Sequence, residues 1–117
     1  MRRCKRWVLI LAVGLVTISL AGCEKPGEGR KAEQGYAAAA PVIEALAAYH
    51  TDHQAYPETL DALIPDYLAA IPQPEAMPPL DYAPTGPSYE LTFEYVGPGM
   101  NRCVYTPEDG WRCSGYF

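Results

Sequence analysis

The chain falls into zones that differ in how apolar and polar residues follow one another. Residues 7–20 form an almost wholly apolar run, and residues 24–34 are polar. In residues 36–55, apolar side chains recur every three or four positions among many alanines, which predicts an amphipathic helix. Residues 56–88 are punctuated by prolines, and residues 88–96 alternate between apolar and polar. The predicted order is therefore a leader, a polar segment, one helix, an irregular segment and strands.

Pro41 is the residue that conflicts with the helical pattern. Proline lacks a backbone N–H and clashes with the preceding turn, so Pro41 should either kink the helix or mark its true start. The apolar stripe expected to face the core consists of Tyr36, Ala39, Ile43, Leu46, Ala47 and His50.

The alternating zone predicts an antiparallel strand with one solvated face. Its apolar positions share one side, and its polar positions, Glu90, Thr92 and Glu94, share the other. We expect the core-facing side to carry Tyr89, Leu91, Phe93 and Tyr95.

Two short segments near the carboxyl terminus, residues 103–105 (CVY) and 111–113 (WRC), flank the sequence TPEDG. This loop suits a hairpin, with a proline for a type I turn and a glycine for a positive φ. If Tyr105 pairs with Trp111, Cys103 lies opposite Cys113. Opposed residues are about 4.5–5.5 Å apart at Cα, within the disulfide range of about 4.4–6.8 Å. The turn and the cysteine spacing thus predict the same register and a Cys103–Cys113 disulfide.

The amino-terminal zone has the parts of an export signal: a basic head, an apolar run and small residues at Ala21 and Gly22. A membrane-spanning helix is the alternative, because the uncharged run over residues 7–23 has 17 residues, near the lower limit for crossing a bilayer. An ordinary secretory signal followed by a structural cysteine is a further alternative.

Residues 20–23, LAGC, resemble the lipobox of bacterial lipoproteins. In that family the signal is removed before the cysteine, and the cysteine carries the lipid. The resemblance implies that Cys23 is the lipidated first residue of the mature chain. It also implies, from Glu24 after the cysteine, delivery to the periplasmic face of the outer membrane rather than retention at the inner membrane.

The fold class predicted is α+β, with one N-terminal amphipathic helix packed on a small antiparallel sheet of about three strands. Residues 56–74 are expected to hold a short turn, and residues 75–88 are expected to be a loop without strands. Residues 1–22 are the predicted lipoprotein signal peptide, residues 23–35 a flexible tether, and residues 36–117 the globular domain with its disulfide-linked C-terminal hairpin.

Removal of the signal makes the chain strongly acidic. The whole chain has 9 basic and 14 acidic residues, and residues 1–22 contain four of the basic ones and none of the acidic ones. The mature chain therefore carries a net charge of −9. Such a chain repels nucleic acid and anionic headgroups, so nucleic acid is excluded as a partner and membrane attachment is expected through the lipid.

Residues 49–72, YHTDHQAYPETLDALIPDYLAAIP, resemble the helix end and the following loop of type IV pilin-like proteins, especially the major pseudopilins of type II secretion. The similarity extends over residues 37–95 and implies a pilin-like globular domain. Pilins keep their apolar helix and assemble through it, whereas here the apolar run precedes Gly22 and is removed. We therefore expect no filament assembly. Residues 97–102 lack the acidic cluster that would repeat the family's calcium site.

The remaining candidate chemistry is sparse. His50 and His53 are weak candidates for metal ligands, because imidazoles three positions apart on a helix can share an ion. The alternative is that His50 packs beside Tyr49 and His53 is a solvated residue that favours the helix C-terminus. Cys103 and Cys113 could instead form a redox pair, although reactive pairs usually lie two residues apart at a helix N-terminus.

No arrangement typical of an enzyme is present, neither a Ser-His-Asp order nor a phosphate-binding loop, and no cofactor is expected. Two classes of function remain. One is a non-catalytic, lipid-anchored interaction or structural module of the cell envelope, with an envelope protein as partner. The other is a lipoprotein that binds a small ligand or metal. An apolar surface patch favours the first class, and a closed pocket lined by His50 and His53 favours the second.

Overall fold

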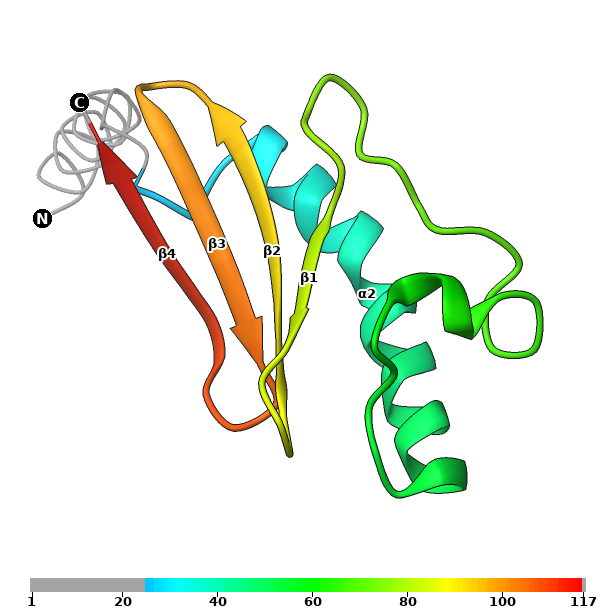
Figure 1. Cartoon of the computed structure of the whole chain (residues 1–117). Coiled ribbons are helices and arrows are strands. Elements are labelled where there is room, and N and C mark those ends of the chain that lie inside the picture. Colours follow the sequence, from blue (N-terminus) through cyan, green and yellow to red (C-terminus); the bar gives the residue numbers. More distant parts are fainter. Residues whose placement is uncertain (1–24, 117) are drawn as a thin grey trace, which may run out of the picture.

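The computed structural model describes residues 25–116 (Figure 1). Helix α2 (Arg30–His53) is followed by the 3-10 turn η1 (Leu60–Leu63) and by strands β1 (Asp81–Pro84), β2 (Tyr89–Val96), β3 (Met100–Thr106) and β4 (Gly110–Tyr116). The strands form an antiparallel sheet in the order β1-β2-β3-β4, and α2 lies along one face of it (Figure 1). The α+β class, the N-terminal helix and the antiparallel sheet are confirmed. The predicted signal peptide and Cys23 lie outside the described residues.

Helix α2 begins earlier than predicted. It starts at Arg30, after Gly29 as its N-cap residue, so residues 30–35 belong to the helix and not to a flexible tether. The reason is tertiary packing: Ala32 and Gly35 are buried against the sheet. A Cβ placed on Gly35 would overlap the ring of Phe93, so the absence of a side chain there lets the helix approach β2 closely. Composition alone could not reveal this contact.

Pro41 lies inside α2, so it does not mark the start of the helix. The helix ends where Gln54 adopts a left-handed conformation (φ 58°) and donates its backbone N–H to the His50 carbonyl at 2.8 Å. Of the expected apolar stripe, Ala39 and Leu46 are buried, whereas Ala47 is exposed. The buried positions of α2 are Ala32, Gly35, Ala39, Val42, Ala45 and Leu46.

The core is the layer between α2 and the sheet. The alternating side chains Leu91, Phe93 and Tyr95 of β2 are buried there, together with Tyr89, as predicted. Leu63 of η1 and Leu80 close the core beneath the proline-rich segment. The segment itself is fixed by Tyr82, which donates a hydrogen bond to the Pro57 carbonyl at 2.7 Å. The irregular zone therefore covers one end of the core.

The sheet has four strands, not about three, because residues 81–84 form β1 within the zone predicted to be a loop. Prolines are numerous in this zone and normally oppose strand pairing. β1 is nevertheless possible because it is an edge strand, and its only proline, Pro84, is its last residue.

The outer face of β2 is less solvated than predicted. Glu90 is exposed and Glu94 is partly exposed, but Thr92 is only 3% exposed. Thr92 pairs with Asp81 on one side and Val104 on the other, in the middle of the sheet. The flanking strands therefore bury Thr92, which the alternating pattern predicted to be exposed to solvent.

The carboxyl-terminal hairpin has the predicted register. Tyr105 pairs with Trp111, and Cys103 faces Cys113 across β3 and β4. The two cysteines form a disulfide, with their Cα atoms 4.1 Å apart. Gly110 has the expected positive φ, 74°. The hairpin and the disulfide are therefore confirmed, and Cys103 is fully buried in the core.

Replacement of both cysteines, Cys103→Ala with Cys113→Ala, should lower the free energy of unfolding by about 2–3 kcal/mol, because the bond restricts the unfolded chain. This loss corresponds to a fall of several degrees in melting temperature for a domain of this size. Melting with and without reductant measures it, with a thiol count on the denatured, unreduced protein as control. An unchanged melt on reduction would contradict a stabilising role and favour the redox alternative.

A candidate interaction site at the amino-terminal end of the domain

The segment before α2 is held against the sheet through Gly27. The Gly27 N–H donates to the hydroxyl of Tyr95 at 2.8 Å, and the Gly27 carbonyl accepts from the hydroxyl of Tyr36 at 2.9 Å. Two tyrosines from different elements therefore satisfy both polar groups of one residue. A tight turn, in which the Glu28 N–H donates to the Lys25 carbonyl at 3.0 Å, joins this residue to α2.

Only glycine fits at this position. Gly27 has a φ of 88°, which side chains rarely adopt. A Cβ placed there would lie 2.6 Å from Cys113 Sγ and 2.9 Å from the Tyr36 hydroxyl oxygen. The backbone of the segment therefore packs directly on the disulfide.

Tyr36 is the residue that joins these parts. Its ring packs edge-on against Phe93 and Trp111, with centroid distances of 5.2 and 5.0 Å. Its hydroxyl oxygen is 3.3 Å from Cys113 Sγ. Burial, with smaller contributions from Tyr95 and Glu28, raises the pKa of Tyr36, so the hydroxyl keeps the proton that it donates to Gly27.

The turn between β2 and β3 lies at the same end of the molecule. Val96 and Met100 are paired across the two strands, and their side chains are 58% and 50% exposed. The Lys31 ammonium group donates to the Val96 carbonyl, which connects this turn to the first turn of α2. A Cβ placed on Gly115 would lie 3.0 Å from Pro26 Cγ and 3.6 Å from the Met100 carbonyl oxygen, so the segment before α2 packs on β4 next to the start of β3.

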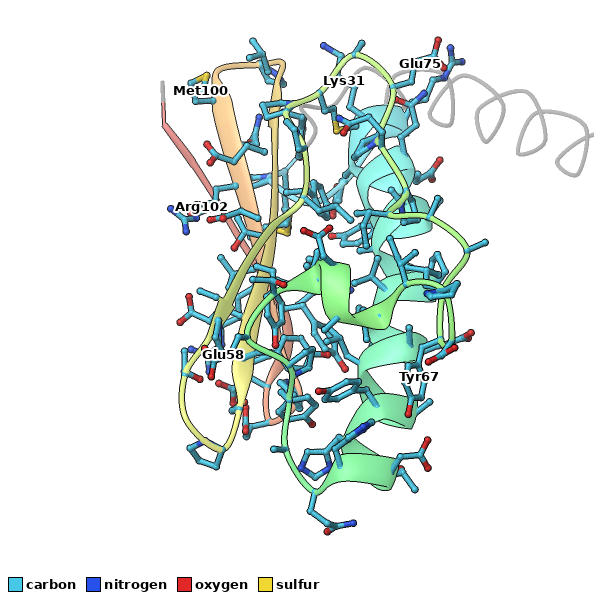
Figure 2. All side chains as sticks on the ribbon, turned by 45° about the vertical axis from the view of Figure 1, so that its right-hand side comes forward. Lys31, Glu58, Tyr67, Glu75, Met100 and Arg102 are labelled. Atoms are coloured by element: carbon cyan, nitrogen blue, oxygen red, sulfur yellow. A yellow bond between two sulfur atoms is a disulfide. The ribbon has the colours of Figure 1, made fainter. Side chains whose placement is uncertain are left out.

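We call this surface, made of residues 25–31 and 96–100, the end face. A shallow groove of about 500 Å³ crosses it. Figure 2 shows Lys31 and Met100 at this end and Tyr67 toward the other. The end face combines exposed aliphatic side chains with three basic side chains and the acidic Glu28. The groove is lined by Glu28, Arg30, Lys31, Tyr95, Gly97 and Pro98.

The weak metal candidates lie elsewhere, at the C-terminal end of α2. His50 stacks on Tyr56 and His53 stacks on Tyr49, with ring centroids 4.4 and 4.0 Å apart. Each imidazole thus faces a different aromatic partner. The expectation that His50 packs on an aromatic ring is met, but the predicted partner is wrong: His50 stacks on Tyr56, and the exposed His53 stacks on Tyr49. Within residues 25–116, no three side chains of the His, Cys, Asp and Glu types are grouped as metal ligands.

The docking of residues 25–29 could not be found from the sequence. Two glycines and a proline in a polar stretch are typical of a flexible linker. The same glycines are needed here because the backbone turns and approaches the disulfide. The exposed Val96 and Met100 flank residues 97–99, GPG, a composition typical of a turn. The sequence does not indicate that this turn lies beside residues 25–31.

Comparison with protein-family models, curated proteins and solved structures finds no match to this chain. Among residues 25–116, no helix combines the length and the apolarity needed to cross a membrane.

Gly27→Ala should destabilise the protein more than Gly86→Ala. Both glycines have positive φ, 88° and 79°, but a Cβ on Gly86 meets nothing within 4 Å. Gly86→Ala therefore adds backbone strain alone, about 1–2 kcal/mol, while Gly27→Ala adds steric overlap of about 1–3 kcal/mol to a similar strain. Chemical denaturation measures the difference, and amide exchange at position 27 reports undocking. Equal effects of the two substitutions would contradict the close packing on Cys113.

Asp52 lies between the two histidines in the sequence and is hydrogen-bonded to the proline-rich segment. It accepts a hydrogen bond of 2.6 Å from the Tyr67 hydroxyl. This bond, followed by burial and the negative charges of Asp52 and Asp66, raises the pKa of Tyr67 to about 12. The carboxylate thus fastens the segment to α2.

Because the pKa of Tyr67 is raised on folding, its stabilising contribution is complete below the ordinary pKa of about 10 and is lost as the pH rises through about 12. Asp52→Asn should move the pKa back toward its ordinary value. Ultraviolet absorbance titration, taken as the difference between the protein and its Tyr67→Phe variant, measures this pKa. An ordinary pKa for Tyr67 in the unmodified protein would show that the hydrogen bond is absent in solution.

Proposed function

We propose that this protein is a non-catalytic interaction or structural module of the bacterial cell envelope, anchored by a lipid on Cys23 and carrying a pilin-like globular domain. The observation that carries this proposal is LAGC at residues 20–23, after a basic head and an apolar run and directly before a polar segment. The lipid is the proposed attachment to the periplasmic face of the outer membrane, and an envelope protein is the proposed partner.

The surface of the domain favours an interaction module over a small-ligand or metal-binding lipoprotein. Val96 and Met100 form an exposed apolar pair at the end face. The groove is open and is not lined by His50 or His53. An exposed apolar pair beside basic groups is better suited to a large surface than to enclosing a small molecule.

The order of helix, irregular segment and antiparallel sheet supports the pilin-like part of the proposal. Pilin filaments depend on an apolar stem that remains on the subunit. The proposed cleavage before Cys23 removes the only long apolar run in the sequence. The mature protein should therefore act as a single anchored domain and not polymerise through such a stem.

Cys23→Ser should abolish lipidation and leave residues 1–22 attached, because the modified cysteine is the proposed cleavage position. Mass spectrometry of the envelope form measures both outcomes: the unmodified protein should begin at a lipid-bearing Cys23. Cys4→Ser is the matched control, since Cys4 lies in the proposed signal and should have no effect. An intact Met1 in the envelope form of the unmodified protein would contradict the anchor, and its fractionation with the inner membrane would contradict outer-membrane delivery.

A further inference from the structure

We propose that the end face rests on the lipid surface that holds the anchor, with the β2–β3 turn at the level of the headgroups. This inference depends on the proposed lipidation of Cys23 and adds to it a defined orientation of the domain. The occupant of the end face is the bilayer itself, not a protein partner.

The first argument is the reach of the chain. Cys23 and Lys25 are separated only by Glu24, and Gly27 is four residues beyond Cys23. Fully extended, these spans are at most about 7 and 14 Å. The headgroup layer on each side of a bilayer is itself about 5–8 Å thick. Since Gly27 is hydrogen-bonded to Tyr36 and Tyr95, a lipid on Cys23 keeps this part of the end face within about two headgroup-layer thicknesses of the lipid.

The second argument is the apolar pair. The exposed large aliphatic side chains of the described residues are Ile64, Val96 and Met100, and the last two are paired beside the docked segment. Their exposure, 58% and 50%, exceeds the 37% of Ile64. Pro98, at the tip of the turn between them, is also exposed. A lipid interface covers such side chains without requiring a complementary protein surface.

The third argument is the uneven distribution of charge. Residues 25–33 contain three basic and two acidic side chains, whereas residues 34–117 contain two basic and eleven acidic ones. Lys25, Arg30 and Lys31 are all exposed. An anionic lipid surface attracts Lys25, Arg30 and Lys31. Glu28 lies among these residues and Glu75 lies at the same end of the molecule (Figure 2), so they reduce this attraction without cancelling it. The charge distribution and the anchor therefore favour the same orientation.

The test uses the full-length protein, processed in the cell and reconstituted in vesicles of phosphatidylethanolamine and phosphatidylglycerol. A nitroxide label is attached to Met100→Cys, or to Thr85→Cys in the exposed β1–β2 turn near the opposite end of the sheet (Figure 1). The label at residue 100 should be severalfold less accessible to a water-soluble nickel complex and more accessible to oxygen, which concentrates in lipid. The label at residue 85 should show the reverse.

Equal accessibility to nickel at the two positions would overturn the proposal. Shielding of residue 100 from both nickel and oxygen would also overturn it, because protein, such as a second copy, would then cover the end face. With the label at residue 100, Val96→Asp should raise nickel accessibility, whereas the matched change Ile64→Asp should not. Equal responses to the two would count against a role for the apolar pair.

Lipidation is tested separately, by the mass of the reconstituted protein. An unmodified Cys23 would refute the proposed anchor. The comparison of labels would still decide the orientation, because it reports whether the end face contacts lipid in any membrane-attached form. A lipidated Cys23 together with a water-exposed residue 100 would refute the orientation and leave the anchor intact.

Discussion

The close approach of α2 to the sheet is the contact on which the other features depend. Gly35 allows it, because any side chain there would overlap Phe93. The approach brings Tyr36 against Phe93, Trp111 and the disulfide. From that position Tyr36 can reach Gly27 and hold the segment that precedes the helix. The core, the hairpin and the docked segment are thus parts of one packing arrangement.

Local chemistry was sufficient to predict the carboxyl-terminal half of the sheet. The TPEDG turn and the cysteine spacing are short-range features, and both specify that Cys103 faces Cys113. The alternation of β2 likewise identified its buried side chains, since one face of a paired strand must be covered. Such local features can be predicted because they depend on residues close together in the sequence and not on distant contacts.

Long-range packing explains what the sequence did not reveal. β1 forms in a proline-rich segment because β2 offers it a partner across four residues. The start of α2 and the docking of Gly27 depend on Phe93, Tyr95 and Cys113, which lie far along the chain. The same holds for the candidate site. Its apolar and basic residues can be identified in the sequence, but they lie close together only because of these long-range contacts.

The attachment of Gly27 has a mechanical consequence for an anchored protein. If Cys23 carries the proposed lipid, a pulling force between the lipid and the domain reaches Gly27 before it reaches α2. There the load is shared by two hydrogen bonds from different elements, Tyr36 on the helix and Tyr95 on β2. Beneath them the covalent link between β3 and β4 keeps the supporting strands together. The domain therefore resists tension at Gly27, where the chain is hydrogen-bonded to β2 and α2. The force does not act first on the amino-terminal turn of α2, so the helix does not unfold from that end.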